Sequence, residues 1–310
     1  MLVDGVVIYV GSHQETFRPT LEQALEAIER AKATFVMLVR DSDLYGAVST
    51  VQQMEDRFNR PFEYPYVFLN DKPFSDSFKD SYPPWISQER AAQPRVRMKN
   101  VIYGSSESYR HMCRYQSGLL VQHQVMLPFD YYWRLEPDVK YSCDMDFDPF
   151  LYMQDNNKKY AFTISLYEYP ETIQGLWDTT KDFMAKYPQL LDKNSAIDLI
   201  SDDGGKTYNG CHFWSNFEIV DTQWMGGQAF QRYFRHLDQA GGFFYERWGD
   251  APIHTIAAVL LLPVEEIHFF REIGYYHPPF HNCPAEPELQ FLEMTKEKSM
   301  VYPEKLDDFL

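Results

Sequence analysis

A run of aromatic and aliphatic residues, Tyr131 to Leu135, ends at two carboxylates, Glu136 and Asp138, that flank Pro137. Aromatic residues favour a half-buried strand and proline cannot donate to a strand ladder, so the pattern predicts a strand whose end presents both acids. In open α/β sheets, ligands bind at this edge. Two carboxylates on one short turn suit Mg²⁺ or Mn²⁺, which can neutralise a diphosphate. The alternative interpretation is an ordinary acidic turn.

The segment before this strand alternates between helical and strand-like patterns. Phe35 to Val39 and Tyr66 to Leu69 are short apolar runs typical of strands buried on both faces. Thr20 to Gln23 has the form of a capping box and predicts an earlier helix, and Asp41 to Asp43 predict the start of another. The predicted buried face of that second helix consists of Leu44, Val48, Val51 and Phe58. A β-α-β order implies a right-handed crossover, so we expect an α/β fold with parallel strands.

Three later segments complete the predicted organisation. Pro73 to Pro94 is rich in proline, serine and charge and is predicted to be mostly loop. Ser108 to Val125 is predicted to form a helix with Tyr109 and Arg110 at its start, where backbone NH groups favour an anionic ligand. Tyr160 to Leu166 is predicted to form a further strand.

Charge and cysteine content narrow the classes of partner. The formal charge of −16 over 310 residues argues against nucleic acid or an anionic membrane surface as a partner, and a nucleotide-sugar would need a cation to bind. No segment is long and apolar enough to span a bilayer, so either the protein is soluble where it is made or its anchor lies outside this sequence. The cysteines lack zinc-site spacing and permit either two disulfides or free thiols. They are Cys113, Cys143, Cys211 and Cys283.

Glu218 lies in a segment rich in aromatic and amide side chains, Cys211 to Ile219. Aromatic faces stack on sugars and Asn216 can bind hydroxyls. A partly desolvated glutamate in such surroundings can act as a nucleophile or stabilise an oxocarbenium-like centre. The alternative is a surface glutamate beside a buried aromatic cluster.

Two further segments carry candidate polar groups. Gly241 to Pro252 contains Asp250, which either caps the helix that starts near the proline or faces acceptor hydroxyls as a hydrogen-bond partner or general base. Glu246 is the other acid considered for that role. His277 lies in an aromatic segment near the end of the chain and suits Mn²⁺ only if it folds back near the first two acids.

Taken together, these segments resemble the fungal Golgi α-1,2-mannosyltransferases, family 15 of the glycosyltransferases. The resemblance is carried by Tyr109 to Gly118, Glu136 to Asp138, His212 to Glu218, Gly241 to Pro252 and Gly274 to Cys283. It implies a GT-A fold, with a mixed, mostly parallel central sheet flanked by helices. The single catalytic domain would cover residues 1–283, with a donor-binding part at about 33–140 and an acceptor and catalytic part at about 141–283, followed by a tail over 284–310. It also implies a type II membrane protein of the Golgi lumen, whose anchor is not in this sequence.

The family's activity is the retaining, Mn²⁺-dependent transfer of mannose from GDP-mannose to the 2-hydroxyl of an acceptor mannose in a protein-linked glycan. Carried over position by position, the resemblance implies metal binding by Glu136, Asp138 and His277, donor binding by Arg110, Glu136 and Asp138, and catalysis by Glu218, Tyr109 and Asp250. Glu218 would either attack the anomeric carbon or stabilise a short-lived ion pair.

The chain departs from the family in three respects: a segment is missing after Asp80, the tail from Ala285 to Leu310 lacks the extra cysteines common in members, and the anchor and stem are not in this sequence. A helix and strand of roughly twenty residues, enough for one βα unit, are expected between Asp80 and Ser81 and are missing. One alternative is therefore a catalytically inactive homologue that binds sugar or nucleotide through a shortened donor part. Another is a glycoside hydrolase that uses Glu218 with Asp250, which is disfavoured because hydrolases seldom need a metal–diphosphate motif.

Overall fold

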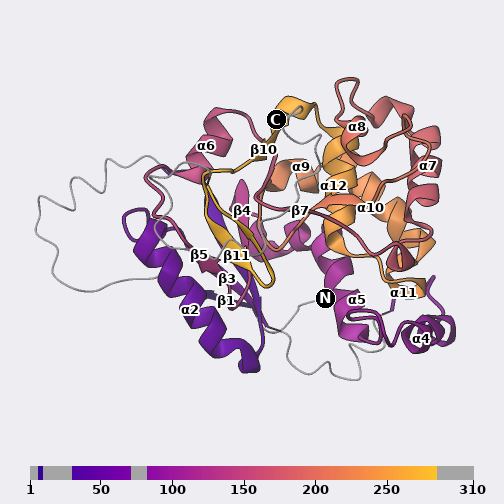
Figure 1. Cartoon of the computed structure of the whole chain (residues 1–310), viewed down its shortest axis with the longest axis horizontal. Helices are drawn as coiled ribbons and strands as arrows, with labels where there is room; N and C mark the ends of the chain where they lie inside the picture. The colour runs from indigo at the N-terminus through magenta and orange to yellow at the C-terminus, as the bar shows by residue number, and fades with distance from the viewer. Residues whose placement is uncertain (1–5, 10–29, 71–81, 285–310) are drawn as a thin grey trace, which may run out of the picture.

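The structure is a computed structural model that describes residues 6–9, 30–70 and 82–284. The helix predicted near Thr20 and the tail beyond residue 284 lie outside the described residues. The central element is a seven-stranded sheet with strand order β1-β3-β2-β4-β9-β6-β10. In Figure 1 this sheet lies between α2 and α6 on one side and a larger group of helices on the other.

Most strands of the central sheet run in one direction. Strands β3, β2, β4, β6 and β10 are mutually parallel, while β1 and β9 run antiparallel to their neighbours. The predicted α/β class with a mixed, mostly parallel sheet is therefore confirmed. The strands span β1 (Val6–Tyr9), β2 (Ala33–Val39), β3 (Tyr66–Asn70), β4 (Tyr131–Leu135), β6 (Tyr160–Phe162), β9 (Glu218–Asp221) and β10 (Ile267–Phe269).

Two small sheets complete the β-structure. One has the order β12-β11-β5 and the other pairs β7 with β8. Their strands are β5 (Lys140–Tyr141), β7 (Ser165–Tyr167), β8 (Cys211–Phe213), β11 (Tyr275–His277) and β12 (Phe280–Asn282). Strand β5 follows the predicted metal turn, and Tyr276 of β11 pairs with Lys140. Continuing this antiparallel register by one residue places His277 opposite Val139, the residue that directly follows Asp138.

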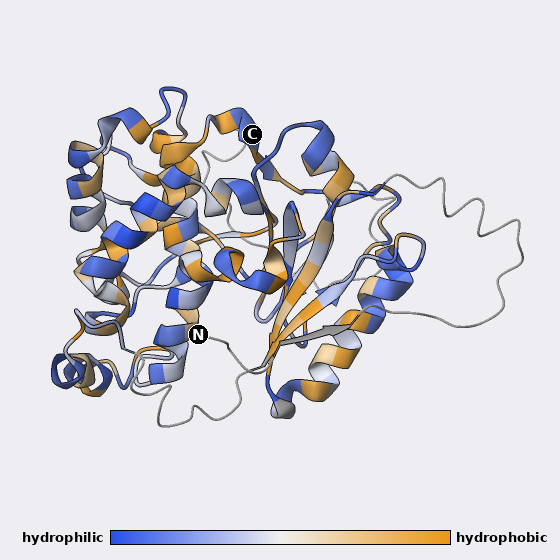
Figure 2. Ribbon diagram, turned by 180° about the vertical axis from the view of Figure 1, so that it is seen from behind, coloured by the Kyte–Doolittle hydropathy of each residue, from blue (hydrophilic) through white to orange (hydrophobic). Residues whose placement is uncertain are grey.

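Helices cover both faces of the sheet. They are α2 (Leu44–Met54), α4 (Gln88–Arg97), α5 (Glu107–Arg114), α6 (Pro149–Asp155), α7 (Leu176–Lys186), α8 (Ile197–Ile200), α9 (Thr222–Gly226), α10 (Gln228–Ala240), α11 (Gly242–Tyr245) and α12 (Asp250–Leu261). Single 3₁₀ or π turns lie at 41–43, 55–59, 115–119, 120–122, 124–126, 170–172, 188–190 and 264–266. Figure 2 shows hydrophobic residues along the central strands and hydrophilic residues concentrated on outward helix surfaces, as expected for layers around a core.

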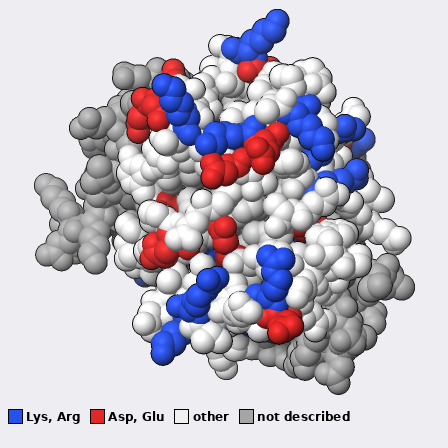
Figure 3. Space-filling model, turned by 90° about the vertical axis from the view of Figure 1, so that its right-hand side faces the viewer, with Lys and Arg blue, Asp and Glu red and all other residues white. Residues whose placement is uncertain are grey.

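The surface of the helical side carries both signs of charge. Figure 3 shows lysine and arginine side chains interspersed with aspartate and glutamate on this face, rather than one continuous basic patch. Side chains of opposite charge therefore lie next to one another on this face.

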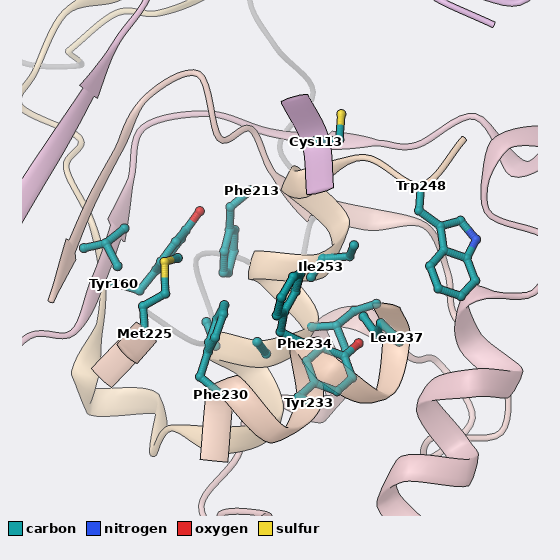
Figure 4. Close-up of a cluster of buried hydrophobic side chains, with 14 of the residues drawn as sticks. Cys113, Tyr160, Phe213, Met225, Phe230, Tyr233, Phe234, Leu237, Trp248 and Ile253 are labelled. Atoms are coloured by element: carbon teal, nitrogen blue, oxygen red, sulfur yellow. The ribbon is translucent and has the colours of Figure 1, made fainter. Parts of the chain in front are cut away.

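Strand β4 separates two buried clusters because successive side chains point to opposite faces. Tyr132 belongs to the cluster on the side of α10 and α12, and Tyr131 and Trp133 belong to the cluster on the side of α2 and α6. Figure 4 shows the first cluster, in which Phe213 packs among side chains from α10 and α12. The ring of Phe213 stacks on that of Phe162, with ring centroids 3.8 Å apart and an angle of 16° between the ring planes. These layers fix the position of the residues at the strand ends.

Several predicted elements are confirmed, and others differ for local reasons. Strands occur where the apolar runs near residues 35, 66 and 131 predicted them. The strand predicted over Tyr160 to Leu166 is divided between β6 and β7, which belong to different sheets. The helix predicted to continue to Val125 ends at Arg114, and turns that include Gly118 follow.

Two predictions are wrong. Part of the segment predicted as loop forms α4, because Ser87 caps its start by accepting from the backbone N of Arg90. The predicted buried face of the helix at Asp41 is wrong at Leu44 and Val48, which are 58% and 55% exposed, and correct at Phe58, just after α2, which is 2% exposed. The positions that face the core are Gly46, Ala47, Thr50 and Met54.

Candidate active site

A cavity of about 1050 Å³ collects side chains from segments that are far apart in the sequence. The predicted site residues that line it are Tyr109, Glu136, Asp138, Asp250 and His277. Arg110 and Glu218 are not among its lining residues. The fold therefore brings the predicted metal ligands and the predicted acceptor-side acid to one cavity, and leaves two predicted residues behind its walls.

Arg134 in β4 holds two of the predicted acids in place. Its Nε and Nη2 donate to Oε1 of Glu136 at 2.9 and 2.6 Å, and its Nη1 donates to Oδ2 of Asp250 at 2.5 Å. The guanidinium is almost fully buried, so these charge-assisted bonds are strong relative to surface pairs. Arg134 thereby links the end of β4 to the start of α12.

Asp250 begins α12, but its carboxylate does not cap the helix. Gly249 occupies the N-cap position, and no side-chain capping bond forms there. Instead Oδ2 of Asp250 accepts from the Oγ of Ser215 at 2.7 Å as well as from Arg134. Burial alone would raise the pKa of Asp250, but Arg134, His254 and Ser215 outweigh it and lower the pKa to about 2. Asp250 is therefore an ionised hydrogen-bond acceptor across the neutral pH range.

Glu218 is fully buried in β9 behind the cavity. Its Oε1 accepts from the hydroxyl of Tyr132 at 2.8 Å, and its Oε2 accepts from the hydroxyl of Tyr160 at 3.0 Å. Burial and the nearby carboxylate hold the pKa of both tyrosines well above the usual value, so both remain donors. Nδ1 of His254 lies 2.8 Å from Oε2 as well. Both carboxylate oxygens are thus engaged by protein groups.

The protonation of His254 follows from its second contact. Its Nε2 lies 3.2 Å from the backbone carbonyl oxygen of Gln116, which can only accept, so Nε2 carries a hydrogen. Burial alone would lower the pKa of His254, but Glu218 and Asp250 raise it above the ordinary value. Both ring nitrogens therefore face hydrogen-bond acceptors, an arrangement that favours the imidazolium form of His254.

Arg110 is also fully buried, and its guanidinium serves the backbone. Nε donates to the carbonyl oxygen of Glu246 at 3.1 Å, and Nη1 donates to the carbonyl oxygen of Ser106 at 2.8 Å. These bonds join the start of α5 to the segment after α11. Its predicted role in donor binding remains a prediction that the cavity lining does not support.

Tyr109 presents its ring to the cavity between two neighbours. It stacks on Tyr103 with ring centroids 4.5 Å apart, and the guanidinium of Arg247 lies 5.3 Å from its ring centroid. Burial holds the pKa of Tyr109 well above its ordinary value, so the hydroxyl stays protonated. Tyr109 is therefore a rigidly placed hydrogen-bond donor.

The predicted metal ligands line the cavity from two segments that are far apart in the sequence. Glu136 and Asp138 follow β4, and His277 ends β11, whose partner β5 begins just after Asp138. In the described part of the chain, no three His, Cys, Asp or Glu side chains are gathered closely enough to hold a metal ion. The donor set nevertheless fits Mn²⁺ chemically, since two carboxylates and an imidazole line the same cavity.

The site includes residues that the sequence analysis did not single out. Arg134 stands two positions before Glu136, on the same face of the strand, and this spacing was the available signal. His254 is four positions after Asp250, on the same helix face, which gave a comparable signal. No local pattern marks Ser215 or the two tyrosines that bind Glu218, because the three lie on different elements.

Sequence comparison assigns the family. The family model described as "Glycolipid 2-alpha-mannosyltransferase", for glycosyltransferase family 15, matches residues 8–81 and 79–299. The chain belongs to this family. The two matched segments meet at residues 79–81, the position where the resemblance predicts a missing βα unit. Residues 71–81 lie outside the described part, so the local structure at this break is not described.

Individual relatives agree with this assignment. The chain is 55% identical over 284 residues to Glycolipid 2-alpha-mannosyltransferase 1 of Candida albicans, which covers 84% of this chain and 66% of that protein. It is 50% identical over 283 residues to Alpha-1,2 mannosyltransferase KTR1 of Saccharomyces cerevisiae, covering 84% of this chain and 72% of that protein. The chain thus spans slightly less than two thirds of the Candida relative.

Solved structures show the same fold. Core-mannan synthase A (CmsA/Ktr4) from Aspergillus fumigatus, in an Mn/GDP form, aligns with a TM-score of 0.78 and 38% identity over 84% of this chain and 78% of that one. The mannosyltransferase Ktr4p from S. cerevisiae, in complex with GDP, aligns with a TM-score of 0.78 and 35% identity over 89% of this chain and 85% of that one.

Among the described helices of the present structure, none combines the length and apolar character needed to cross a membrane.

Proposed function

We propose that this chain transfers mannose from GDP-mannose to the 2-hydroxyl of an acceptor mannose in a protein-linked glycan, with retention of configuration. The observation that carries the proposal is the convergence of Glu136, Asp138 and His277 with Asp250 and Tyr109 on one cavity. Family membership supports mannose transfer, and the Mn/GDP form of the Aspergillus relative supports the choice of nucleotide and metal.

Glu136, Asp138 and His277 are proposed to hold Mn²⁺. When bound, the metal would neutralise charge on the diphosphate leaving group. Arg134 keeps the Glu136 carboxylate at the cavity through two hydrogen bonds, and this fixes one metal-facing group in advance. The protein's net charge of −16 repels a free diphosphate, and a cation held by these three side chains would offset that repulsion at the cavity.

On the acceptor side, Asp250 and Tyr109 are proposed to orient hydroxyl groups. A carboxylate whose pKa is about 2 is a weak base at neutral pH, so Asp250 contributes by accepting a hydrogen bond from the acceptor rather than by removing its proton early. The hydroxyl of Tyr109 donates near the reacting sugar. Orientation of two reactants in one cavity lowers the entropic part of the barrier.

The position of Glu218 favours one of the two retaining routes. Its carboxylate is fully buried, does not line the cavity and accepts hydrogen bonds on both oxygens. A nucleophile needs an oxygen within reach of the anomeric carbon, so we propose that Glu218 supports a short-lived ion pair through its charge instead of forming a bond. The same placement counts against a hydrolase, whose two carboxylates must flank one bond.

The direct test is transfer from GDP-mannose to an α-mannoside acceptor, with and without Mn²⁺. NMR analysis of the product is expected to show a new α-1,2 linkage that requires the metal. A β-linked product or a metal-independent reaction would contradict the proposal. Location in the Golgi lumen as a type II membrane protein is part of this proposal and is tested by fluorescence microscopy of the full-length protein.

One observation favours a second candidate. The family match is broken at residues 79–81, within the predicted donor part. A homologue that binds GDP-mannose without transferring mannose would result if the shortened segment is needed for catalysis. Isothermal titration with GDP-mannose separates the cases, since binding without product identifies the inactive homologue.

A further inference from the structure

Tyrosines form one wall of the cavity and expose much of their surface. Tyr103, Tyr167 and Tyr169 line the cavity and are 56%, 60% and 53% exposed. Tyr103 is held by its stack on Tyr109, and Tyr169 directly precedes the 3₁₀ turn at 170–172. Exposed aromatic rings gathered at a cavity mark a binding surface, because their faces pack against ligands.

Two charged side chains lie within this tyrosine wall. Nη2 of Arg247 donates to Oε1 of Glu168 at 3.3 Å, and the backbone N of Tyr169 donates to the same oxygen at 2.8 Å. Arg247 is 2% exposed and lines the cavity, yet its Nε has no hydrogen-bond partner in the described structure. A buried, unpaired donor is costly unless a ligand or a small shift satisfies it.

The tyrosine wall lies close to Gly249, the residue before Asp250. A Cβ atom at Gly249 would lie 3.6 Å from Oε2 of Glu168 and 4.0 Å from the hydroxyl of Tyr109. Arg134, by contrast, connects Asp250 to Glu136. Contacts therefore link Asp250 to the predicted metal ligand Glu136 through Arg134, and its neighbour Gly249 lies near Glu168 of the tyrosine wall.

We propose that the tyrosine wall, made of Tyr103, Tyr167 and Tyr169 with Arg247 and Glu168, binds the second and third sugars of an oligomannoside acceptor. This inference rests on the proposed function. Sugar rings offer C–H faces to the tyrosines, and their hydroxyls can both accept from arginine and donate to glutamate.

The test compares methyl α-mannoside with α-1,2-mannotriose, by titration calorimetry in the presence of GDP and Mn²⁺ and by kcat/KM for transfer. The trisaccharide is expected to bind about tenfold more tightly, and Tyr169→Ala is expected to remove about fivefold of this advantage. Tyr169→Phe keeps the ring and should keep the advantage. Methyl α-mannoside should bind equally to all three proteins, because it does not reach the wall.

Tyr45→Ala is the matched control, since Tyr45 is 87% exposed on α2 and does not line the cavity. Equal binding of the two sugars by the unaltered protein would overturn the inference, as would an equal loss in the Tyr45 and Tyr169 variants. Because binding is measured without turnover, a protein that prefers the trisaccharide but transfers nothing overturns the proposed function and leaves this binding site in place.

Discussion

The imidazole Nδ1 of His254 lies 2.8 Å from Oε2 of Glu218, and both side chains are fully buried. The groups that face this pair are the hydroxyls of Tyr132 and Tyr160, the carbonyl of Gln116 and, at longer range, the charges of Asp250 and Arg134. A buried ion pair of this kind stabilises the fold only while both partners are charged.

Stability is expected to fall as His254 loses its proton. Since the pKa of His254 is raised in the folded state, the pair contributes fully below the unfolded pKa of about 6.5, and its contribution is lost as pH rises through the folded pKa. Urea unfolding should show His254→Asn less stable by about 3 kcal/mol at pH 6, with a smaller difference at higher pH.

The double variant His254→Asn with Glu218→Gln removes both charges and is the control. It should recover part of the lost stability. Its free energy of unfolding should also lack the decrease above pH 6.5 that this pair causes in the unaltered protein. If the free energies of unfolding of the unaltered protein and of His254→Asn differ by the same amount at every pH above 6.5, the imidazole is not charged in the folded state.

No covalent mannosyl adduct is expected on Glu218 during turnover. Both of its oxygens accept hydrogen bonds from protein groups, and neither faces the cavity. Intact-mass spectrometry of enzyme quenched with acid after mixing with GDP-mannose should show only the unmodified chain. A mannosyl adduct mapped to Glu218 by peptide sequencing would establish the direct-attack route instead.

The metal assignment predicts weaker Mn²⁺-dependent binding of GDP in Glu136→Ala and His277→Ala. Removing one ligand should lower the affinity about 10- to 100-fold, because the remaining groups hold the ion incompletely. Titration calorimetry with GDP, with and without Mn²⁺, measures this. His281→Ala is the matched control, since His281 lies on the same hairpin but does not line the cavity. Equal affinity in all four proteins would remove these residues from the metal site.

The sequence predicts the parts of the site that depend on local pattern. The aromatic run forms β4, and the two acids follow the end of this strand, as predicted. Strand propensity and the position of Pro137 are enough to predict both features from eight consecutive residues. The position of His277 depends on the register between β11 and β5, which are over a hundred residues apart, so the sequence supplied the residue but not the contact. The burial of Glu218 is the feature of the site that the sequence indicates least. Its burial follows from donors on β4, β6 and α12, and no spacing within its own segment indicates them.

Gly46 offers a test of the metal turn that alters none of its proposed ligands. It lies in α2, and a Cβ atom there would be 2.5 Å from Cγ and 2.6 Å from Oδ1 of Asp138. Gly46→Ala improves helix propensity by about 1 kcal/mol, but the Asp138 carboxylate has to rotate away from the helix. We therefore expect Mn²⁺-dependent GDP affinity to drop about threefold to tenfold while thermal stability is maintained. Ala47→Gly, the reverse exchange at the next position, should lower stability without lowering GDP affinity in folded protein. If Gly46→Ala binds GDP and Mn²⁺ as the unaltered chain does, the position of the Asp138 carboxylate against α2 has no part in metal binding.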